Sequence, residues 1–268
     1  MRPLDVRIEA ALGTFDEDCR WDLIGGILTE CPDDVLEAAL ILLHDDLDRR
    51  RTLGADILGR LVGVEPNSGP VVVEALLASI AVETSPSPLA SIVAALGHVG
   101  NVASLESIFP LADHASPEVR LAVAFAVATI SPQPLSDEAC TALLRLCRDA
   151  DAEVRDWATF GLGTLSDADG PEIRAALLAR AEDASREARA EALFGLAVRR
   201  DPRAVPHLIR ALQSPFVGGL EVDAAAVSAD PRLLPALWAL RNAGGADQHR
   251  VLRAIDRCSG RDRQNLPS

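Results

Sequence analysis

The sequence predicts an all-α protein, an α-solenoid of about eight antiparallel helix pairs. Two observations carry this prediction: a composition suited to helices and an internal repeat of about 34 residues. Hydrophobic residues make up 49% of the 268 residues, whereas aromatic residues make up only 3%. Alanine, leucine and valine therefore supply most of the apolar surface, and alanine and leucine are strong helix formers.

The repeat is clearest in three segments: EVRLAVAFAVATI, EVRDWATFGLGTL and EARAEALFGLAVR. Their arginines, Arg120, Arg155 and Arg189, are 35 and 34 residues apart, and Arg51 lies 69 residues before Arg120, about two periods. In the remaining repeats the arginine position holds Glu17, Pro86 and Asp223. A repeat of this length is typical of stacked helical units.

Each of these helices follows another apolar helical segment, and Pro or Gly marks the junctions. The junction residues are Pro32, Gly69-Pro70, Gly170-Pro171, Pro202 and Pro231, and the first turn of a helix tolerates Pro. One helix pair cannot bury its own apolar face, whereas a stack of pairs can. We therefore expect one solenoid over residues 1–258, with its first pair at 3–29, its last at 231–258, an irregular repeat near 213–230, and a flexible tail at 259–268.

The three segments resemble the second helix of HEAT repeats, in the short bacterial form also found in phycobilisome-lyase-like proteins. The pattern of that family is Val-Arg-x-x-Ala-Ala-x-Ala-Leu-Gly-x-Leu. It is strongest over residues 102–200 and recognisable over 33–62. The resemblance implies a HEAT-like superhelix, and it says little about function because such folds serve many roles.

The resemblance also implies an internal ladder, in which each arginine pairs with an aspartate of the preceding turn. The implied pairs are Asp45 with Arg51, Asp113 with Arg120, Asp149 with Arg155, and Asp183 with Arg189. Arginine suits this role because its planar group forms several hydrogen bonds at once. We interpret these arginines as structural residues.

In HEAT repeats the second helices line the concave surface, and the positions one, two, five and nine residues after the arginine are variable. In this chain three consecutive repeats place Phe125, Phe160 and Phe194 at the fifth position, and Trp157 is at a second position. Exposed aromatic rings predict a partner groove, because each has about 150–250 Å² to bury. Two alternatives stay open: the rings pack on one another or into the seams between repeats, or they form a dimer interface.

Acidic residues share these variable positions. We expect a partner-binding surface made of Leu121, Phe125, Asp156, Trp157, Phe160, Glu191 and Phe194, together with Asp22 and Asp56 at an acidic end. An acidic end next to an aromatic middle suits a peptide or helix with basic and apolar residues. The alternative for the acidic residues is an ordinary solvated surface.

The charge of the chain excludes one class of partner. All 26 basic residues are arginine, and 40 acidic residues give a formal net charge of −14. Nucleic-acid binding needs a positive surface, so we expect no nucleic-acid partner.

Motifs of catalysis are missing from the sequence. The five histidines form no HExxH motif and none precedes a glutamate, and there is no P-loop, dinucleotide fingerprint or G-x-S-x-G turn. We therefore name no catalytic residue, no metal ligand and no cofactor, and we lean against an enzyme.

The sequence has no recognisable targeting segment. Charges interrupt the first apolar residues, no stretch approaches the roughly 18 apolar residues of a membrane span, and the five cysteines have no CxxC spacing. We expect a cytoplasmic protein without membrane contact, present as a monomer or weak dimer.

The leading functional hypothesis is a non-catalytic scaffold or adaptor that binds a partner peptide or helix on the concave face. Two alternatives remain: a lyase-like or maturation-factor subunit that holds a small hydrophobic cofactor in the groove, and an immunity or antagonist protein that caps a basic partner.

Overall fold

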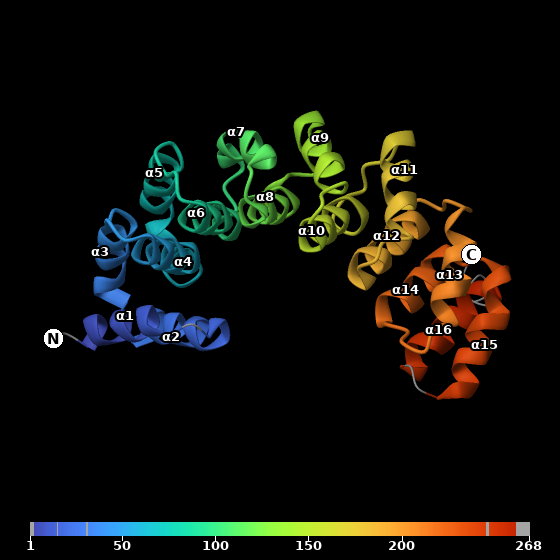
Figure 1. Cartoon of the computed structure of the whole chain (residues 1–268). Coiled ribbons are helices and arrows are strands. Elements are labelled where there is room, and N and C mark those ends of the chain that lie inside the picture. Colours follow the sequence, from blue (N-terminus) through green and yellow to red (C-terminus); the bar gives the residue numbers. More distant parts are fainter. Residues whose placement is uncertain (1–2, 15, 31, 245–246, 261–268) are drawn as a thin grey trace. The chain divides into compact units, whose positions relative to one another are not determined.

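The protein is built from helices. The computed structural model describes residues 3–14, 16–30, 32–244 and 247–260, and within these ranges it has sixteen α-helices, four short 3₁₀ helices and no strand (Figure 1). The prediction of an all-α solenoid of about eight helix pairs is confirmed. By their contacts the helices group into two compact units, residues 1–132 and 133–268, which are described separately.

Unit 1 consists of four helix pairs in two layers. The second helices α2, α4, α6 and α8 pack on one another in succession, and each of α1, α3, α5 and α7 packs against the second helix of its own pair. The helices are α1 (Pro3–Gly13), α2 (Glu17–Glu30), α3 (Pro32–Leu43), α4 (Asp48–Val64), α5 (Gly69–Ile80), α6 (Pro86–Val99), α7 (Leu105–Ile108) and α8 (Pro117–Ile130). The short α7 lies between two 3₁₀ helices, Val102–Ser104 and Phe109–Asp113.

Unit 2 repeats this arrangement. Its second helices α10, α12, α14 and α16 form one layer, and α9, α11, α13 and α15 form the other. The helices are α9 (Asp137–Leu146), α10 (Ala152–Gly163), α11 (Pro171–Arg180), α12 (Arg186–Val198), α13 (Ala204–Leu212), α14 (Gly219–Ser228), α15 (Leu234–Ala243) and α16 (Gln248–Cys258). A 3₁₀ helix, Pro231–Leu233, precedes α15.

The helix boundaries agree with the junction signals in the sequence. Proline stands in the first turn of α5, α6, α8 and α11, where the missing N–H costs no helical hydrogen bond. The α10 helix begins behind Asp151, whose carboxylate accepts the backbone N–H groups of Glu153 and Val154 at 2.9 and 3.2 Å. The predicted first and last pairs lie within a few residues of the observed ones, whereas the predicted tail lies outside the described residues except for Ser259 and Gly260.

Glycine lets two second helices of unit 2 touch at their backbones. A Cβ atom on residue 195 would lie 2.5 Å from the Cα atom of Gly163, and one on residue 163 would lie 2.8 Å from the carbonyl oxygen of Glu191. No side chain fits at either position without moving a helix. This contact fixes how the side chains of α10 and α12 face one another.

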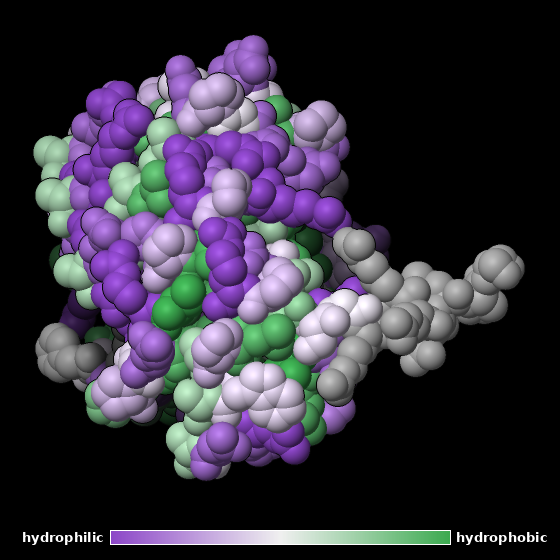
Figure 2. Space-filling view, turned by 90° about the vertical axis from the view of Figure 1, so that its right-hand side faces the viewer, coloured by the Kyte–Doolittle hydropathy of each residue, from purple (hydrophilic) through white to green (hydrophobic). Residues whose placement is uncertain are grey.

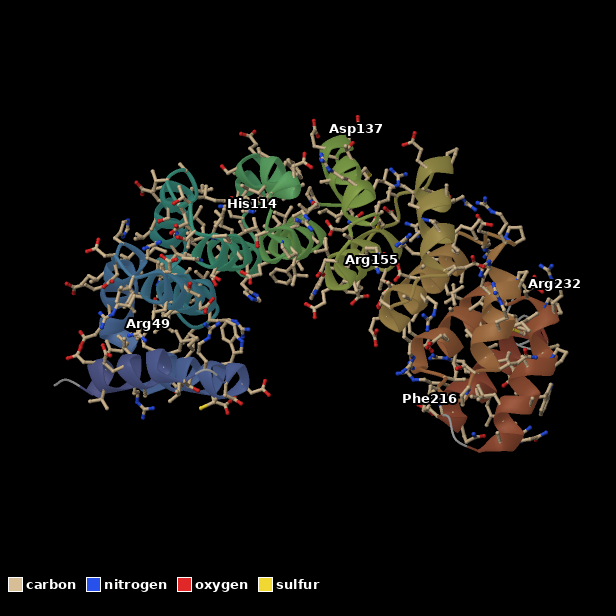
Figure 3. All side chains as sticks on the ribbon, viewed as in Figure 1. Arg49, His114, Asp137, Arg155, Phe216 and Arg232 are labelled. Carbon is tan, nitrogen blue, oxygen red and sulfur yellow. The ribbon has the colours of Figure 1, made fainter. Side chains whose placement is uncertain are left out.

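The stretch 213–230, where an irregular repeat is expected, contains a loop and a short helix. The segment Gln213–Gly218 has no helix, and α14 has 10 residues where α12 has 13. The ring of Phe216 in this segment is 75% exposed (Figure 3). The extra loop therefore shortens the second helix of this pair, as expected from its glycines.

The arginine ladder exists, but the carboxylate partners predicted for Arg51, Arg155 and Arg189 are wrong. Arg155 Nη1 donates to the backbone carbonyl oxygens of Asp149 and Ala150 at 2.9 Å each. Its Nε and Nη2 atoms donate to the carboxylate of Asp183, which belongs to the next helix pair, at 2.8 and 2.9 Å. Asp149 thus contributes its main chain to Arg155, and the carboxylate comes from one repeat further along.

The same correction applies to Arg51 and Arg189. Arg51 Nη1 donates to the carbonyl oxygens of Asp45 and Asp46, and its Nε donates to Glu83 of the next pair at 2.6 Å. Arg189 donates to the carbonyl oxygen of Asp183, not to its carboxylate. The reason is geometric: the guanidinium folds back under its own turn, so its other edge faces the neighbouring repeat.

The fourth predicted pair was Asp113 with Arg120. Arg120 Nη1 donates to the carbonyl oxygens of His114 and Ala115 at 2.8 and 2.9 Å. These bonds repeat those of the other three arginines, so the side chain has the same conformation in all four repeats.

Candidate functional site

The candidate site lies on two neighbouring second helices of unit 2. Asp156, Trp157 and Phe160 come from α10, and Glu191 comes from the adjacent α12; all four side chains are partly buried. The rings of Trp157 and Phe160 meet edge to face, with their centroids 5.6 Å apart and their planes at 81°. We call these four residues the acidic–aromatic face.

The carboxylate of Asp156 lacks a counter-charge. Its Oδ1 atom is buried and accepts no hydrogen bond from the described residues, and the side chain makes no ion pair there. Burial, the largest cause, and the negative charges of Glu187, Glu153 and Asp183 raise the pKa of Asp156. An oxygen in this state binds a donor more readily than a solvated one, because its desolvation has already occurred.

Glu191 is the second carboxylate of the face. The hydroxyl of Thr164, just after α10, donates a hydrogen bond to Glu191 Oε2. Burial, the largest cause, and the negative charge of Asp156 raise the pKa of Glu191 although this hydrogen bond opposes the shift. The negative charge of Asp156 is thus among the causes that raise the pKa of Glu191, which agrees with the position of the two residues on helices that pack together.

This arrangement is suited to holding a cation. Two carboxylates that repel one another gain more from an added positive charge than two isolated ones would. The faces of aromatic rings also attract ammonium and guanidinium groups. The acidic–aromatic face can therefore accept a lysine or arginine side chain, together with apolar neighbours on the rings.

Phe194 belongs to a different part of unit 2. No ring contact joins it to Phe160 in the described part of the chain. It lines a cavity of about 740 Å³ between α12, α14 and α16, with Asp223, Arg200 and Arg253 among the other walls. Asp223 bonds Arg250 and Arg253 of α16. Of the three predicted phenylalanines, Phe194 is therefore the one that lines this cavity.

Sequence reasoning missed the arginines of this cavity. Arg200 follows α12, and Arg253 lies on α16, outside the region where the repeat pattern is strong. The available signal was the cluster of arginines in RVLRAIDRC at residues 250–258, whose one-turn spacing places several of them along one side of a helix.

In unit 1 the predicted residues Leu121 and Phe125 lie on α8, and both are partly buried. The ring of Phe125 packs on the preceding second helix, α6. Its centroid lies 4.9 Å from that of His98, and a Cβ atom on residue 97 would lie 2.6 Å from the ring. Phe125 therefore fills the seam between two repeats, the alternative that the sequence left open.

The predicted acidic end is also built differently from expectation. Asp56 is only 7% exposed, and its carboxylate lies 3.0 Å from the guanidinium of Arg20. The expectation of an open carboxylate at this position is wrong, because α2 supplies a cation that covers it. Next to this pair, the guanidinium carbon of Arg60 lies 4.7 Å from the centre of the Trp21 ring. Asp22, the other predicted acidic residue, has an exposed side chain.

The last helix pair carries apolar side chains at its surface. Figure 2 shows the side of the molecule on which α13 and α15 lie, with hydrophilic residues over most of its upper part and hydrophobic residues gathered lower down. Trp238 and Leu252 are 38% and 40% exposed. The guanidinium carbon of Arg241 lies 5.0 Å from the centre of the Trp238 ring, so a charged group covers part of this indole.

The described residues contain no candidate for a membrane span or a metal centre. No helix there combines the length and the apolar character that a membrane span requires. No group of three or more His, Cys, Asp or Glu side chains in these ranges is arranged to hold a metal ion.

Two family models match the sequence. The model of HEAT repeats matches residues 73–163, and the model of the PBS lyase HEAT-like repeat matches residues 188–214. The second match includes Glu191 of the acidic–aromatic face. No curated protein matches the sequence significantly.

Solved structures share the fold. YibA of Escherichia coli is 24% identical, with a TM-score of 0.76 over 95% of this chain and 92% of that one. An engineered protein is 18% identical, with a TM-score of 0.59 over 96% and 77% of the two chains. The complex of CpcE and CpcF of phycocyanin lyase from Nostoc sp. PCC7120 is 15% identical, with a TM-score of 0.53 over 84% and 87%.

These likenesses concern the fold, and they agree with the stacked helix pairs of this chain. The chain is a HEAT-repeat protein.

Proposed function

We propose that this protein is an interaction scaffold whose acidic–aromatic face binds a basic, amphipathic segment of a partner protein. The observation that carries the proposal is the pair Asp156 and Glu191: two partly buried carboxylates on neighbouring helices, neither of which makes an ion pair in the described residues. A lysine or arginine side chain would supply the missing charge and a donor for Asp156 Oδ1.

The aromatic pair gives the proposed surface its apolar part. Trp157 and Phe160 lie on the same helix as Asp156 and are only partly buried. A helical ligand with basic and apolar residues one turn apart could contact the carboxylates and the rings together. The net charge of −14 would speed the approach of such a ligand.

The alternative function is the binding of a small hydrophobic cofactor. Its support is the likeness to CpcE and CpcF, and that likeness concerns only the fold. The chemistry of the acidic–aromatic face favours a cation, because an apolar molecule would leave the buried oxygen of Asp156 without a donor. We therefore favour a basic protein segment.

The proposal is tested with Trp157 as the reporter. In a Trp21→Phe, Trp238→Phe variant, Trp157 is the remaining tryptophan. An amphipathic helical peptide with arginines and leucines should change its emission, and a matched peptide with glutamate for arginine should not. Binding should weaken as salt rises.

Two substitutions complete the test. Asp156→Asn with Glu191→Gln should weaken binding of the basic peptide about tenfold or more, which corresponds to about 1.4 kcal/mol. Asp22→Asn, which removes an exposed carboxylate of unit 1, is the matched control and should leave the affinity unchanged. Equal binding of the basic and acidic peptides would contradict the proposal.

A further inference from the structure

Three arginines of the ladder hold the same conformation on their inner side. In each, Nη1 donates to two successive backbone carbonyl oxygens of the preceding turn: Asp45 and Asp46 for Arg51, Asp149 and Ala150 for Arg155, and Asp183 and Ala184 for Arg189. The Nε and Nη2 atoms of each guanidinium therefore point the same way, toward the next helix pair.

For two of these arginines, Arg51 and Arg155, a carboxylate of the next helix pair accepts hydrogen bonds from Nε and Nη2, which form the outer edge of the guanidinium. Glu83 accepts from Arg51 Nε and Nη2 at 2.6 and 3.2 Å, and Asp183 accepts from Arg155 Nε and Nη2 at 2.8 and 2.9 Å. Each carboxylate stands two residues before the N-cap of a second helix and also accepts the N-cap backbone N–H, from Ser85 and Ser185 respectively. The position of the acid is thus fixed by the turn.

Arg189 has no such partner. Its hydrogen bonds within the described ranges are the two to carbonyl oxygens, and it makes no ion pair there. The N-cap of the next second helix is Gly218, so the residue two positions earlier is Phe216. The inserted loop has placed an exposed aromatic side chain where the repeats of α6 and α12 have Glu83 and Asp183.

The open edge of Arg189 lies at a cavity of about 590 Å³, which we call the Arg189 pocket. Leu193 and Phe216 are among its apolar lining residues, and the charged residues Glu182, Asp183, Arg186, Arg210 and Glu221 also line it. Each of these acids already has a cation: Asp183 bonds Arg155 and Arg180, Glu182 bonds Arg210, and Glu221 lies 3.5 Å from Arg186. Among the arginines that line the pocket, Arg189 is the one that makes no ion pair in the described residues.

We propose that the Arg189 pocket binds a carboxylate that is supplied by another molecule and takes the place of the missing ladder acid. The two parallel N–H groups of Nε and Nη2 match the two oxygens of a carboxylate, as they do in the Arg51 and Arg155 pairs. Phe216 and Leu193 offer an apolar wall to the rest of the ligand. This site is distinct from the acidic–aromatic face and does not depend on the function proposed for it.

The carboxylate can come from a small molecule or from an acidic side chain of a peptide, and titration calorimetry with the full chain separates the two. One arm uses glutarate, and the other uses a short peptide with one central glutamate between apolar residues. The same peptide with glutamine is the matched control ligand. We expect a carboxylate ligand to bind at millimolar concentration or below and the glutamine peptide to bind at least about tenfold more weakly.

Substitution of Arg189 locates the site. Arg189→Gln should weaken binding about tenfold or more, and Arg189→Lys should not restore it because lysine lacks the two parallel donors. Arg232→Gln is the control: Arg232 pairs with Asp230 at 2.7 Å, and it does not line the Arg189 pocket. Equal loss in both variants, or no loss in Arg189→Gln, would overturn the proposal.

A second variant keeps Arg189 and supplies it with a carboxylate from the protein itself. Phe216→Asp restores an acid two residues before the N-cap of α14, so it should pair with Arg189, raise the melting temperature and abolish carboxylate binding. Phe216→Asn is the matched neutral variant and should leave binding in place. Unchanged binding in Phe216→Asp, or no carboxylate binding by the wild-type chain at millimolar concentration, would refute the assignment.

Discussion

Arg155 and Asp183 form a two-point ion pair between successive helix pairs of unit 2. The Nε–Oδ2 and Nη2–Oδ1 distances are 2.8 and 2.9 Å, and Asp183 is 7% exposed. Figure 3 shows Arg155 at α10. Asp183 follows Arg155 by 28 positions and lies in the turn between α11 and α12, so this bond ties neighbouring repeats together.

Removal of this bond should destabilise the protein. Arg155→Ala is expected to lower the free energy of unfolding by about 1–3 kcal/mol, because Asp183 loses two of its hydrogen bonds and the carbonyl oxygens of Asp149 and Ala150 lose a donor. Arg232→Ala, which breaks a pair between exposed side chains, should cost under about 1 kcal/mol. Urea denaturation checks both, and equal costs would show that the ladder has no special role.

The same pair predicts a pH dependence. The pKa of Asp183 is lowered from 3.8 to about 2, and the hydrogen bond from Arg155 is the largest cause of this shift. A folded-state pKa below the unfolded one means that the contribution is present above about pH 4 and is lost as pH falls toward 2. The wild type should therefore lose more stability than Asp183→Asn over this range, as acid titration of the melting temperature would show. Parallel curves for the two proteins would contradict the linkage.

Asp156 should respond in the opposite sense. Because burial and neighbouring charges raise its pKa, the folded state binds the proton more tightly, and the stability present at low pH is lost as pH rises through the raised value. Asp156→Asn should thus be neutral or stabilising at neutral pH, by up to about 1 kcal/mol. Thermal melts at neutral pH, compared with those of Asp183→Asn, provide the check. Destabilisation as large as that of Asp183→Asn would show that Asp156 has a structural partner.

Substitutions of Phe125 and Phe160 should differ in their cost to stability. Phe125→Ser should lower stability by about 2–4 kcal/mol, toward the range for a packed ring, because Phe125 covers Gly97 and His98. Phe160→Ser should cost less, about 1–2 kcal/mol, since the edge-to-face contact with Trp157 contributes only about 0.5–1.5 kcal/mol beyond its buried area. Phe216→Ser, at a 75% exposed ring, is the control and should be near zero. Equal costs for all three variants would refute this ranking.

Arg199 should be a strong structural residue. Its guanidinium is buried and donates to the carbonyl oxygens of Leu162, Gly163, Ser166, Ala168 and Gly195. Arg199→Met should cost about 2–4 kcal/mol because these oxygens lose their donor. Arg199→Lys should not restore the stability, since an ammonium cannot reach them all.

The adjacent Arg200 gives a matched control for this variant. Its side chain is exposed, so Arg200→Met should change the melting temperature little. If the two methionine variants melt together, the carbonyl contacts of Arg199 do not stabilise the fold.

The sequence by itself determined the helix pairs and their boundaries. Apolar periodicity, the repeat of Arg120, Arg155 and Arg189, and proline at helix starts are local signals, since each acts within one or two turns of helix. They were sufficient to place the first pair and the last, and to locate the irregular segment before α14.

Only the tertiary structure decided which groups meet. It gave Arg155 the carboxylate of Asp183, covered Asp56 with Arg20, and left Asp156 and Arg189 without ion pairs in the described residues. These partners lie about one repeat apart, and their meeting depends on the rotation and spacing of packed helices. A repeat pattern fixes which face of a helix is buried, but the atoms that meet across two helices depend on the close contacts between them, such as that of Gly163 with Gly195.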